Sequence, residues 1–587
     1  MTRCLTAVLA ALAAAAPVGG VLVAPERAAA HAVVEETEPR RSAALDSAPE
    51  RVSIRFNEAI ESQFGALRVF DVEGNEVQVG EAVRPSSTEI AARLPADLPD
   101  GAYTATYRVV SADSHPVSGG FTFTVGDSGG VSAAGVADLL GDQSAGPVTD
   151  AAFGAVRVVS YTAIALLAGG ALFLVVAWLP ALRAVGPRPT AQWTQAARAF
   201  QGRTTAVMLV AAASGLVASV AGIVAQGATV SGSSFWGAID ADLLHDVLDT
   251  RFGEVWKLRF TAFGVLVPLL LYLPPLDARA GRLPVGPWRA LAIGAGLAFL
   301  VASPALGGHA GADGDALALV ALDTLHVAAM SAWIGGVALI VLALSFATRA
   351  LGQGERGPLL AAVLARFSTI ALVAVATLLL TGIVQSLLYL ESVDALWETA
   401  FGRAILVKAA LFAVLIGFGV YHRRRSLPAL REIAARGARP GRVGIALRRA
   451  LRGELVLFAG VLVATAALVS YSPSVTAGGP FGGSVDLGPA QMEITVDPAS
   501  PGDNEIHVYL FDSQTGAQYD RPREFSLTAT EEELDIGPIE LRVRKAGPGH
   551  YTVLRAPLAP AGDWTIEARA LISDFEELRG DFEVPIR

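Results

Sequence analysis

The sequence has almost no cysteine and few charged residues. Its only cysteine is Cys4, which excludes disulfides, iron–sulfur clusters and thiolate metal sites from the body of the chain. Charged residues make up 17% of the 587 residues and hydrophobic residues 52%, whereas soluble domains carry about 25% charged residues. The composition predicts an integral membrane protein. Any metal must be bound by His, Met, carboxylate or backbone groups.

Motifs of several enzyme classes are also missing. The sequence has no GxxxxGK[ST] phosphate loop, no Cys-Pro-Cys helix and no DKTGT stretch, which excludes an ATP-driven pump on this chain. No Ser–His–Asp or paired-carboxylate constellation has a supporting context. A haem-bearing membrane oxidoreductase would need His ligands on facing helices, and the apolar segments offer only His326, with His309 at their rim. We therefore expect no enzymatic activity and no nucleic-acid partner.

Residues 1–30 predict a signal peptide. Arg3 precedes an apolar run, and Ala28 and Ala30 suit the small-residue requirement of signal peptidase. Cleavage after Ala30 would leave His31 as the N-terminal residue. The alternative is an uncleaved anchor helix.

Residues 31–127 predict a β-sandwich or barrel, because several runs alternate apolar and polar residues between turn clusters. Asp113 and His115 lie two residues apart and share a face if their segment is extended. With the α-amine and imidazole of His31 they provide three nitrogens and one oxygen, a set that suits tetragonal Cu(II), although zinc could use the same ligands. The alternative is that Asp113 and His115 only fix a turn before Pro116.

Residues 128–152 are rich in Gly, Ala and Ser and predict a linker. Region 153–472 follows, with apolar segments long enough to cross a bilayer as helices. We count eight segments: 155–182, 204–227, 257–275, 287–306, 316–346, 361–388, 403–421 and 453–472. They predict an eight-helix transmembrane bundle.

Loop charge predicts the orientation of this bundle. Segment 183–203 has four Arg and no acid, and loop 422–452 has ten Arg against one Glu, whereas loop 228–256 carries five acidic residues near its middle and end. The positive-inside rule places the Arg-rich loops in the cytoplasm. With eight crossings, both ends of a multi-pass protein of the plasma (inner) membrane would be extracytoplasmic.

The membrane region contains an internal repeat with an offset of about 166 residues, which predicts two parallel four-helix repeats. The matched stretches are 214–219 with 381–386, and Gly169–Gly170 with Gly335–Gly336. In that register Ser160 takes the place of His326. Arg157 takes the place of Asp323. Metal-competent residues thus belong to the second half, which predicts one intramembrane site.

Segment 316–346 carries that site. Asp323, His326 and Met330 are three and four residues apart and share one helix face, and ionisable groups at this depth are functional candidates. His309, in the preceding loop, could join His326 and Met330 as ligands for Cu(I), with Asp323 orienting an imidazole. The alternative is that His326 forms a hydrogen bond within the bundle and Met330 fills space.

Residues 473–488 predict a second linker, and seven short strands in 489–587 predict an immunoglobulin-like β-sandwich. His507 alternates with apolar residues and should face solvent, while His550 follows a Pro-Gly turn. These two residues could form a weak copper acceptor site with Met492. The alternative is that they are scattered surface residues of a docking domain.

Three resemblances cover most of the chain. The stretch from HAVVEETEPRRSAAL to SADSHPVSGGFTFTVG resembles the CopC family of periplasmic copper-binding proteins, which implies Cu(II) ligands at His31, Asp113 and His115. Region 150–472 resembles the CopD family of copper-resistance and copper-uptake membrane proteins through LDTLHVAAMSAWIGGV and GGHAG. The C-terminal region resembles YtkA-like domains. A Met-rich Cu(I) loop, found in some CopC members, has no counterpart, because no Met lies between residues 31 and 207.

These observations predict a copper-binding membrane protein that captures Cu(II) outside the cell membrane and passes copper inward, contributing to copper homeostasis and resistance. Its partners would be copper ions, the lipid bilayer and an extracytoplasmic copper chaperone or reductant, because Cu(II) held by N and O needs reduction before a His/Met path suits it. The alternative is a copper-delivery protein for cuproenzyme assembly, with the membrane part as anchor or sensor.

Overall fold

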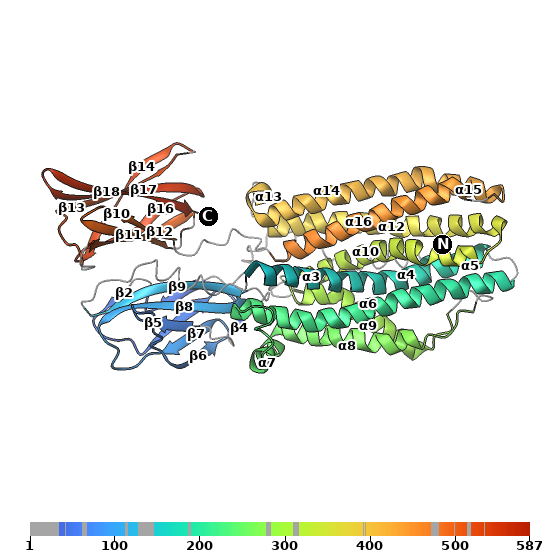
Figure 1. Ribbon diagram of the computed structural model, residues 1–587, viewed down its shortest axis with the longest axis horizontal. Coiled ribbons are helices and arrows are strands. Elements are labelled where there is room, and N and C mark those ends of the chain that lie inside the picture. The colour runs from blue at the N-terminus through green and yellow to red at the C-terminus, as the bar shows by residue number, and fades with distance from the viewer. Residues whose placement is uncertain are drawn as a thin grey trace. The chain divides into compact units, whose positions relative to one another are not determined.

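The computed structural model has an N-terminal β region, a helical region and a C-terminal β region (Figure 1). It describes residues 34–40, 43–61, 67–111, 116–126, 146–185, 190–277, 283–308, 316–390, 393, 395–438, 440–470, 481–497, 499, 501–513, 518–532 and 534–586. The predicted signal peptide and the candidate ligands His31, Asp113, His115 and His309 lie outside the described residues.

The N-terminal region is a sandwich of two sheets, with strand orders β1-β3-β7-β6 and β2-β9-β8-β4; β5 also pairs with β8. The alternating pattern explains its core: Val52, Ile54 and Phe56 of β3 are buried against residues of the second sheet, such as Tyr107. The strands are β1 (Val34–Glu38), β2 (Ala43–Leu45), β3 (Arg51–Phe56), β4 (Ile60–Glu61), β5 (Leu67–Phe70), β6 (Val79–Ser86), β7 (Glu89–Arg93), β8 (Gly101–Ser111) and β9 (Pro116–Val125). The predicted N-terminal β domain is confirmed.

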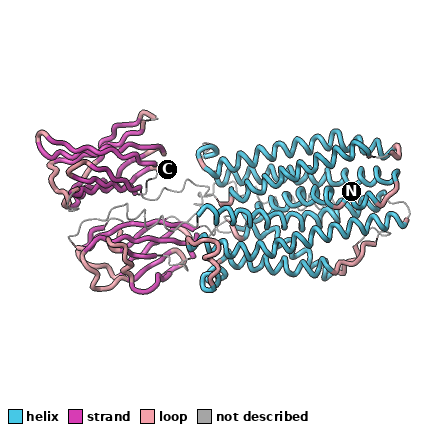
Figure 2. The backbone as a smooth tube through the Cα atoms, viewed as in Figure 1, coloured by secondary structure: helices cyan, strands magenta, loops and turns pink. Residues whose placement is uncertain are grey.

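The helical region consists of long helices, some of which contain short π-helical turns (Figure 2, cyan). The elements of the first half are α3 (Gly146–Ile164), η2 (Ala165–Gly169), α4 (Gly170–Phe173), η3 (Leu174–Trp178), α5 (Leu179–Val185), α6 (Ala191–Ser231), α7 (Ala241–Asp249), α8 (Arg251–Leu271) and α9 (Pro287–Leu306). Those of the second half are α10 (Ala316–Leu342), α11 (Leu344–Arg349), α12 (Gln353–Tyr389), α13 (Ala395–Glu398), α14 (Ala400–Tyr421), η5 (His422–Ser426), α15 (Leu427–Ala435) and α16 (Gly441–Leu468).

Within the described residues, seven helices are long and apolar enough to cross a membrane. They are Gly146–Val185, Ala191–Ser231, Pro287–Leu306, Leu317–Arg349, Gly354–Tyr389, Ala400–Ala435 and Gly441–Leu468. The predicted segment 257–275 falls mostly in α8, which is helical over 21 residues but carries Arg251, Glu254, Lys257 and Arg259. The predicted count of eight spans is not confirmed, because α8 has only 21 residues and its four charged residues leave no apolar stretch as long as those of the other helices.

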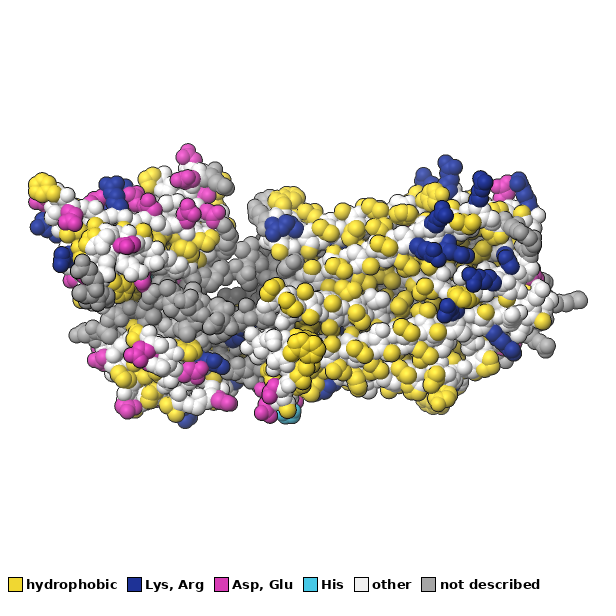
Figure 3. Space-filling view, viewed as in Figure 1, with side chains coloured by type: hydrophobic (Ala, Val, Ile, Leu, Met, Phe, Trp, Pro, Cys, Tyr) yellow, Lys and Arg dark blue, Asp and Glu magenta, His cyan; other side chains and the backbone are white. Residues whose placement is uncertain are grey.

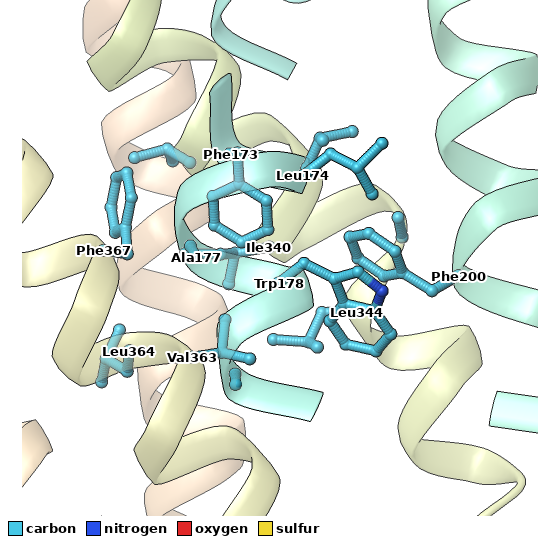
Figure 4. Packing of buried hydrophobic residues seen from close by; sticks show 14 of the residues in the cluster. Phe173, Leu174, Ala177, Trp178, Phe200, Ile340, Leu344, Val363, Leu364 and Phe367 are labelled. Atoms are coloured by element: carbon cyan, nitrogen blue, oxygen red, sulfur yellow. The ribbon is translucent and has the colours of Figure 1, made fainter. Parts of the chain in front are cut away.

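Large apolar side chains fill the centre of the helical region (Figure 4). Trp178 of η3 stacks on Phe200 of α6 with ring centroids 3.8 Å apart. Phe173 of α4 contacts Phe367 of α12 edge to face, with centroids 5.9 Å apart. This core joins helices of both halves of the sequence.

Two glycines allow a close crossing between the halves. A Cβ atom on Gly169 of η2 would collide with the carbonyl of Ser331 on α10, and one on Gly335 would collide with the carbonyl of Ala165. Only glycine allows this approach of two helix backbones. Gly169 and Gly335 are matched in the predicted repeat, and an approximate twofold relation between the halves would bring them together. The repeat itself stays a prediction.

The C-terminal region also contains two sheets, with strand orders β10-β11-β12-β16-β15 and β14-β13-β17-β18, around one core. The strands are β10 (Phe481–Asp486), β11 (Ala490–Asp497), β12 (Gly502–Asp512), β13 (Glu524–Glu531), β14 (Ile536–Leu541), β15 (Arg544–Gly547), β16 (His550–Leu558), β17 (Gly562–Ser573) and β18 (Glu576–Ile586). A β-rich C-terminal region is confirmed, and its immunoglobulin-like fold stays a prediction. β10 lies inside the predicted linker 473–488, so part of that segment is a strand. Its glycines have a low intrinsic strand propensity, and pairing with β11 stabilises the strand instead.

Candidate metal sites

A polar cluster lies between α10 and α12 in the apolar helical region. Asp323 and His326 are one helical turn apart on α10, and Thr381 and Gln385 are one turn apart on α12. Gln385 Nε2 donates a hydrogen bond of 3.1 Å to Asp323 Oδ1, and His326 Nδ1 lies 2.8 Å from Thr381 Oγ1. The structure therefore places Asp323 and His326, two of the predicted site residues, in one polar cluster.

The hydrogen bonds of Thr381 define the tautomer of His326. The threonine hydroxyl has one proton, which it donates to the Thr377 carbonyl at 2.7 Å. Thr381 Oγ1 therefore accepts a hydrogen bond from His326 Nδ1–H. In the neutral ring this leaves the lone pair on Nε2, which is the form that binds a metal ion.

Lys408 of α14 adds a positive charge to this cluster. Its ammonium interacts electrostatically with both Asp323 and His326. Asp323 compensates that charge, whereas a metal ion at His326 would be repelled by it.

Helix α8 carries a different cation at the same distance from its N-cap threonine. Thr250 caps α8 by accepting from Gly253 N at 3.1 Å, and Thr399 caps α14 by accepting from Gly402 N at 2.9 Å. Nine residues after its cap, α8 carries Arg259, where α14 carries Lys408. Arg259 is buried and donates to Ser303 Oγ at 2.8 Å, so it acts as a permanent structural cation.

Met330 has a packing role in the structure. It lies partly buried against two hydrophobic clusters of the helical region. One turn further along α10, Trp333 contacts Phe458 and Phe412 edge to face, with centroids 5.1 and 6.0 Å apart. These aromatic rings lie on the side of the polar cluster that faces the C-terminal end of α10.

A second buried polar pair was missed by the sequence analysis. His422 Nε2 lies 2.7 Å from Glu454 Oε1, and its Nδ1 lies 3.0 Å from Ser426 Oγ. His422 is 8% exposed and Glu454 2%. The predicted loop 422–452 is wrong, because η5, α15 and the start of α16 make most of this segment helical. The usable signal was Glu454, a lone acid in an apolar segment.

The C-terminal histidines also come together. His507 Nδ1 lies 2.9 Å from His550 Nε2, so these residues are not scattered over the surface. Met492 is fully buried in the core on the other face of the sheet and does not join them. His507 was expected to face solvent, but it is 4% exposed.

Within the part of the chain that the structure describes, no group of three or more His, Cys, Asp or Glu side chains is placed to hold a metal ion. The predicted N-terminal site falls outside that part. Val110 of β8 pairs with Pro116 of β9, and residues 112–115 lie between these two strands in the sequence.

The sequence matches three known families. Residues 34–126 match the CopC domain, residues 148–318 the copper resistance protein D-like N-terminal domain, and residues 361–468 copper resistance protein D. "Copper transport protein CutJ" of Bacillus subtilis (strain 168) is 27% identical over 563 residues, which cover 94% of this chain and 95% of the relative.

Two further relatives match parts of the chain. "Copper resistance protein D" of Pseudomonas syringae pv. tomato is 28% identical over 330 residues, which cover 55% of this chain and 97% of the relative. "Copper resistance protein C" of Escherichia coli is 32% identical over 108 residues, which cover 17% of this chain and 83% of the relative. The similarity thus includes both the N-terminal β region and the helical region.

Proposed function

Because the chain belongs to the copper-resistance proteins and joins CopC and CopD domains in one polypeptide, we propose that it imports copper across the plasma membrane. The observation that carries the proposal is the polar cluster of the helical region. His326 lies within an apolar bundle with its Nδ1 on Thr381 Oγ1, in one polar cluster with Asp323 and Gln385, and its neutral ring would present Nε2 to a metal ion. An imidazole is costly to bury at this depth, so ionisable residues in membrane helices usually mark a functional site.

The distribution of positive charge supports an orientation of the helical region in the membrane. Figure 3 shows Lys and Arg side chains gathered at the end of the helical region that holds α15, and the exposed Arg423, Arg424 and Arg425 of η5 belong to this group. The positive-inside rule makes this end cytoplasmic. Asp323 and His326 lie in the first half of α10, toward the opposite end. Copper would therefore meet them first from outside.

The buried pair His422–Glu454 provides a second polar site, nearer the cytoplasmic end than the Asp323–His326 cluster. Lys408 and His422 are 14 residues apart along α14 and η5, a separation of about 21 Å at helical rise. The aromatic contact of Trp333 with Phe458 lies between the two polar sites. Copper would pass from the first polar site to the second, and the aromatic rings would form the barrier between them.

The N-terminal β region would capture Cu(II) through His31, Asp113 and His115. The donor set of these three residues and the match of residues 34–126 to the CopC domain support this assignment. One electron per copper ion, from an external reductant or partner, would convert Cu(II) to Cu(I) before transport.

The copper content of cells that express the His326→Ala variant tests this proposal. Import through the helical region predicts that accumulation falls to the level of cells without the protein, while copper bound at the cell surface is unchanged. Normal accumulation would instead favour a delivery protein whose membrane part is an anchor.

Cu(II) capture is tested by electron paramagnetic resonance on the purified chain with His31 as its first residue. A matched chain with one residue added before His31 is the control. We expect a tetragonal Cu(II) signal that weakens in the control. Equal signals from both chains would remove His31 from the site.

A further inference from the structure

The five-stranded sheet of the C-terminal region carries a polar cluster on the face away from its core. Alternate residues of β12 belong to the core, so Glu505, His507 and Tyr509 lie on the opposite face. His550 on the neighbouring strand β16 pairs in register with Tyr509. His507 is 4% exposed and His550 partly exposed, so the cluster is sheltered yet accessible from one side.

The side chains of this cluster form a chain of short contacts. Glu505 Oε1 lies 3.2 Å from His507 Nε2, and His507 Nδ1 lies 2.9 Å from His550 Nε2. The Tyr509 ring stacks on the imidazole of His550, with centroids 4.3 Å apart and planes 17° apart. The stacking fixes the plane of the His550 ring.

The carboxylate determines which nitrogen of His507 is free. An ionised Glu505 can only accept a hydrogen bond, so His507 carries its proton on Nε2. Its Nδ1 lone pair then points at His550 Nε2. Without a metal, His550 Nε2–H donates a hydrogen bond to this lone pair. When the His550 proton is on Nδ1 instead, both facing nitrogens have a lone pair for a metal ion.

We propose that His507 and His550 bind a copper ion, as Cu(I), between these two nitrogens. Glu505 would hold the His507 ring through Nε2–H, the carboxylate–histidine–metal arrangement found around metal ligands. The nitrogens would separate from 2.9 Å to about 4 Å, because each metal–nitrogen bond is about 2.0 Å long. Two nitrogens in line suit Cu(I), whereas Cu(II) prefers a tetragonal set of N and O ligands. This site rests on the proposed copper function.

Electrostatics support a cation at this place. Glu505 lies 3.2 Å from the His507 ring and can balance the charge of a bound cation. Glu493 of β11 pairs in register with Tyr509 and has a buried carboxylate oxygen with no hydrogen-bond partner. Glu493 and Glu505 both act electrostatically on Tyr509, whose ring stacks on His550. With two nitrogen ligands and a low coordination number, the site suits temporary binding and transfer.

The test is Cu(I) titration of the purified full-length chain against a chromogenic Cu(I) chelator. The other proposed copper ligands are removed in all samples by His31→Ala, Asp113→Ala, His115→Ala, His309→Ala and His326→Ala, together with the double change His422→Leu and Glu454→Leu. We expect one Cu(I) per chain in this background and its loss on His550→Ala. The exposed His245 on α7 provides the control, and His245→Ala should leave binding unchanged.

The Glu505→Gln variant tests the role of the carboxylate. It should keep the stoichiometry and weaken Cu(I) affinity about 10–100-fold. If His550→Ala fails to fold, His550→Gln gives the same comparison, with folding checked by thermal unfolding. Undiminished Cu(I) binding by the His550 variants, or binding of zinc but not of Cu(I), would overturn the proposal. Because binding is measured without transport, a failure of the import mechanism leaves this result readable.

Discussion

The hydroxyl of Thr381 should control copper movement through His326. It is the acceptor for His326 Nδ1–H and keeps the Nε2 lone pair available. Thr381→Val preserves the shape of the side chain but leaves that N–H without its acceptor, at a cost of about 1–3 kcal/mol when buried. The ring would then turn or change tautomer. Loss of such an orienting partner typically weakens metal binding about 10–100-fold.

We therefore expect Thr381→Val to reduce the initial rate of cellular copper uptake about 10–100-fold, measured by mass spectrometry at matched protein levels. Thr381→Ser restores the hydroxyl and should keep most of the rate. Ser386→Ala is the matched control, because Ser386 donates only a local hydrogen bond of 2.8 Å to the Gly382 carbonyl on the same helix. Uptake by Thr381→Val at the unmodified rate would refute the role assigned to the Thr381–His326 hydrogen bond.

Three further variants test other parts of the structure. Glu454→Leu should destabilise the helical region by about 3–5 kcal/mol in thermal unfolding, because it leaves His422 buried without the Glu454 carboxylate. A double variant that also carries His422→Leu should recover much of that loss. No recovery would contradict the pairing of these two residues. Gly335→Ala should lower the yield of folded protein, whereas Gly294→Ala, where a Cβ meets no atom within 4 Å, should not; equal yields would contradict the close crossing. The free energy of opening of β16, measured by hydrogen exchange, should fall by at most about 3 kcal/mol between pH 6.5 and pH 4, because the pKa of His550 is about 4 in the folded chain and near 6.5 when unfolded. His550→Gln should abolish this pH dependence. The same pH profile in that variant as in the unmodified chain would contradict the assignment to His550.

Local patterns in the sequence predicted much of the fold. The alternation in 51–56 places Val52, Ile54 and Phe56 in a sandwich core, and the apolar run 316–346 largely coincides with α10 and α11. Such patterns work because they reflect which face of an element is buried, a property that neighbouring residues determine.

Contacts between distant segments could not be read in this way. The spacing on α10 indicated that Asp323 and His326 share a face, but it did not identify Thr381 or Gln385 as their partners. His422 and Glu454 are 32 residues apart, and the many Arg residues between them made the segment look like a loop although it is largely helical. Partners that come from separate helices depend on tertiary packing, which one sequence does not contain.

The C-terminal histidines show the same limit. Alternation on β12 placed His507 on the face away from the core, as the structure has it. Its low exposure and its contact with His550 depend on β16, which begins 43 residues later in the sequence. Sequence alone therefore gave the correct face but not the pairing.

Copper uptake into sealed vesicles that contain only the purified chain is the most direct test of the central claim. Isotopically labelled copper is supplied outside with a reductant, and copper inside is measured over time for the unmodified chain and for His326→Ala. Our account predicts that the unmodified chain fills the vesicles, whereas His326→Ala binds copper outside and fills them no faster than protein-free vesicles leak. Filling by His326→Ala at the unmodified rate would contradict transport through this cluster.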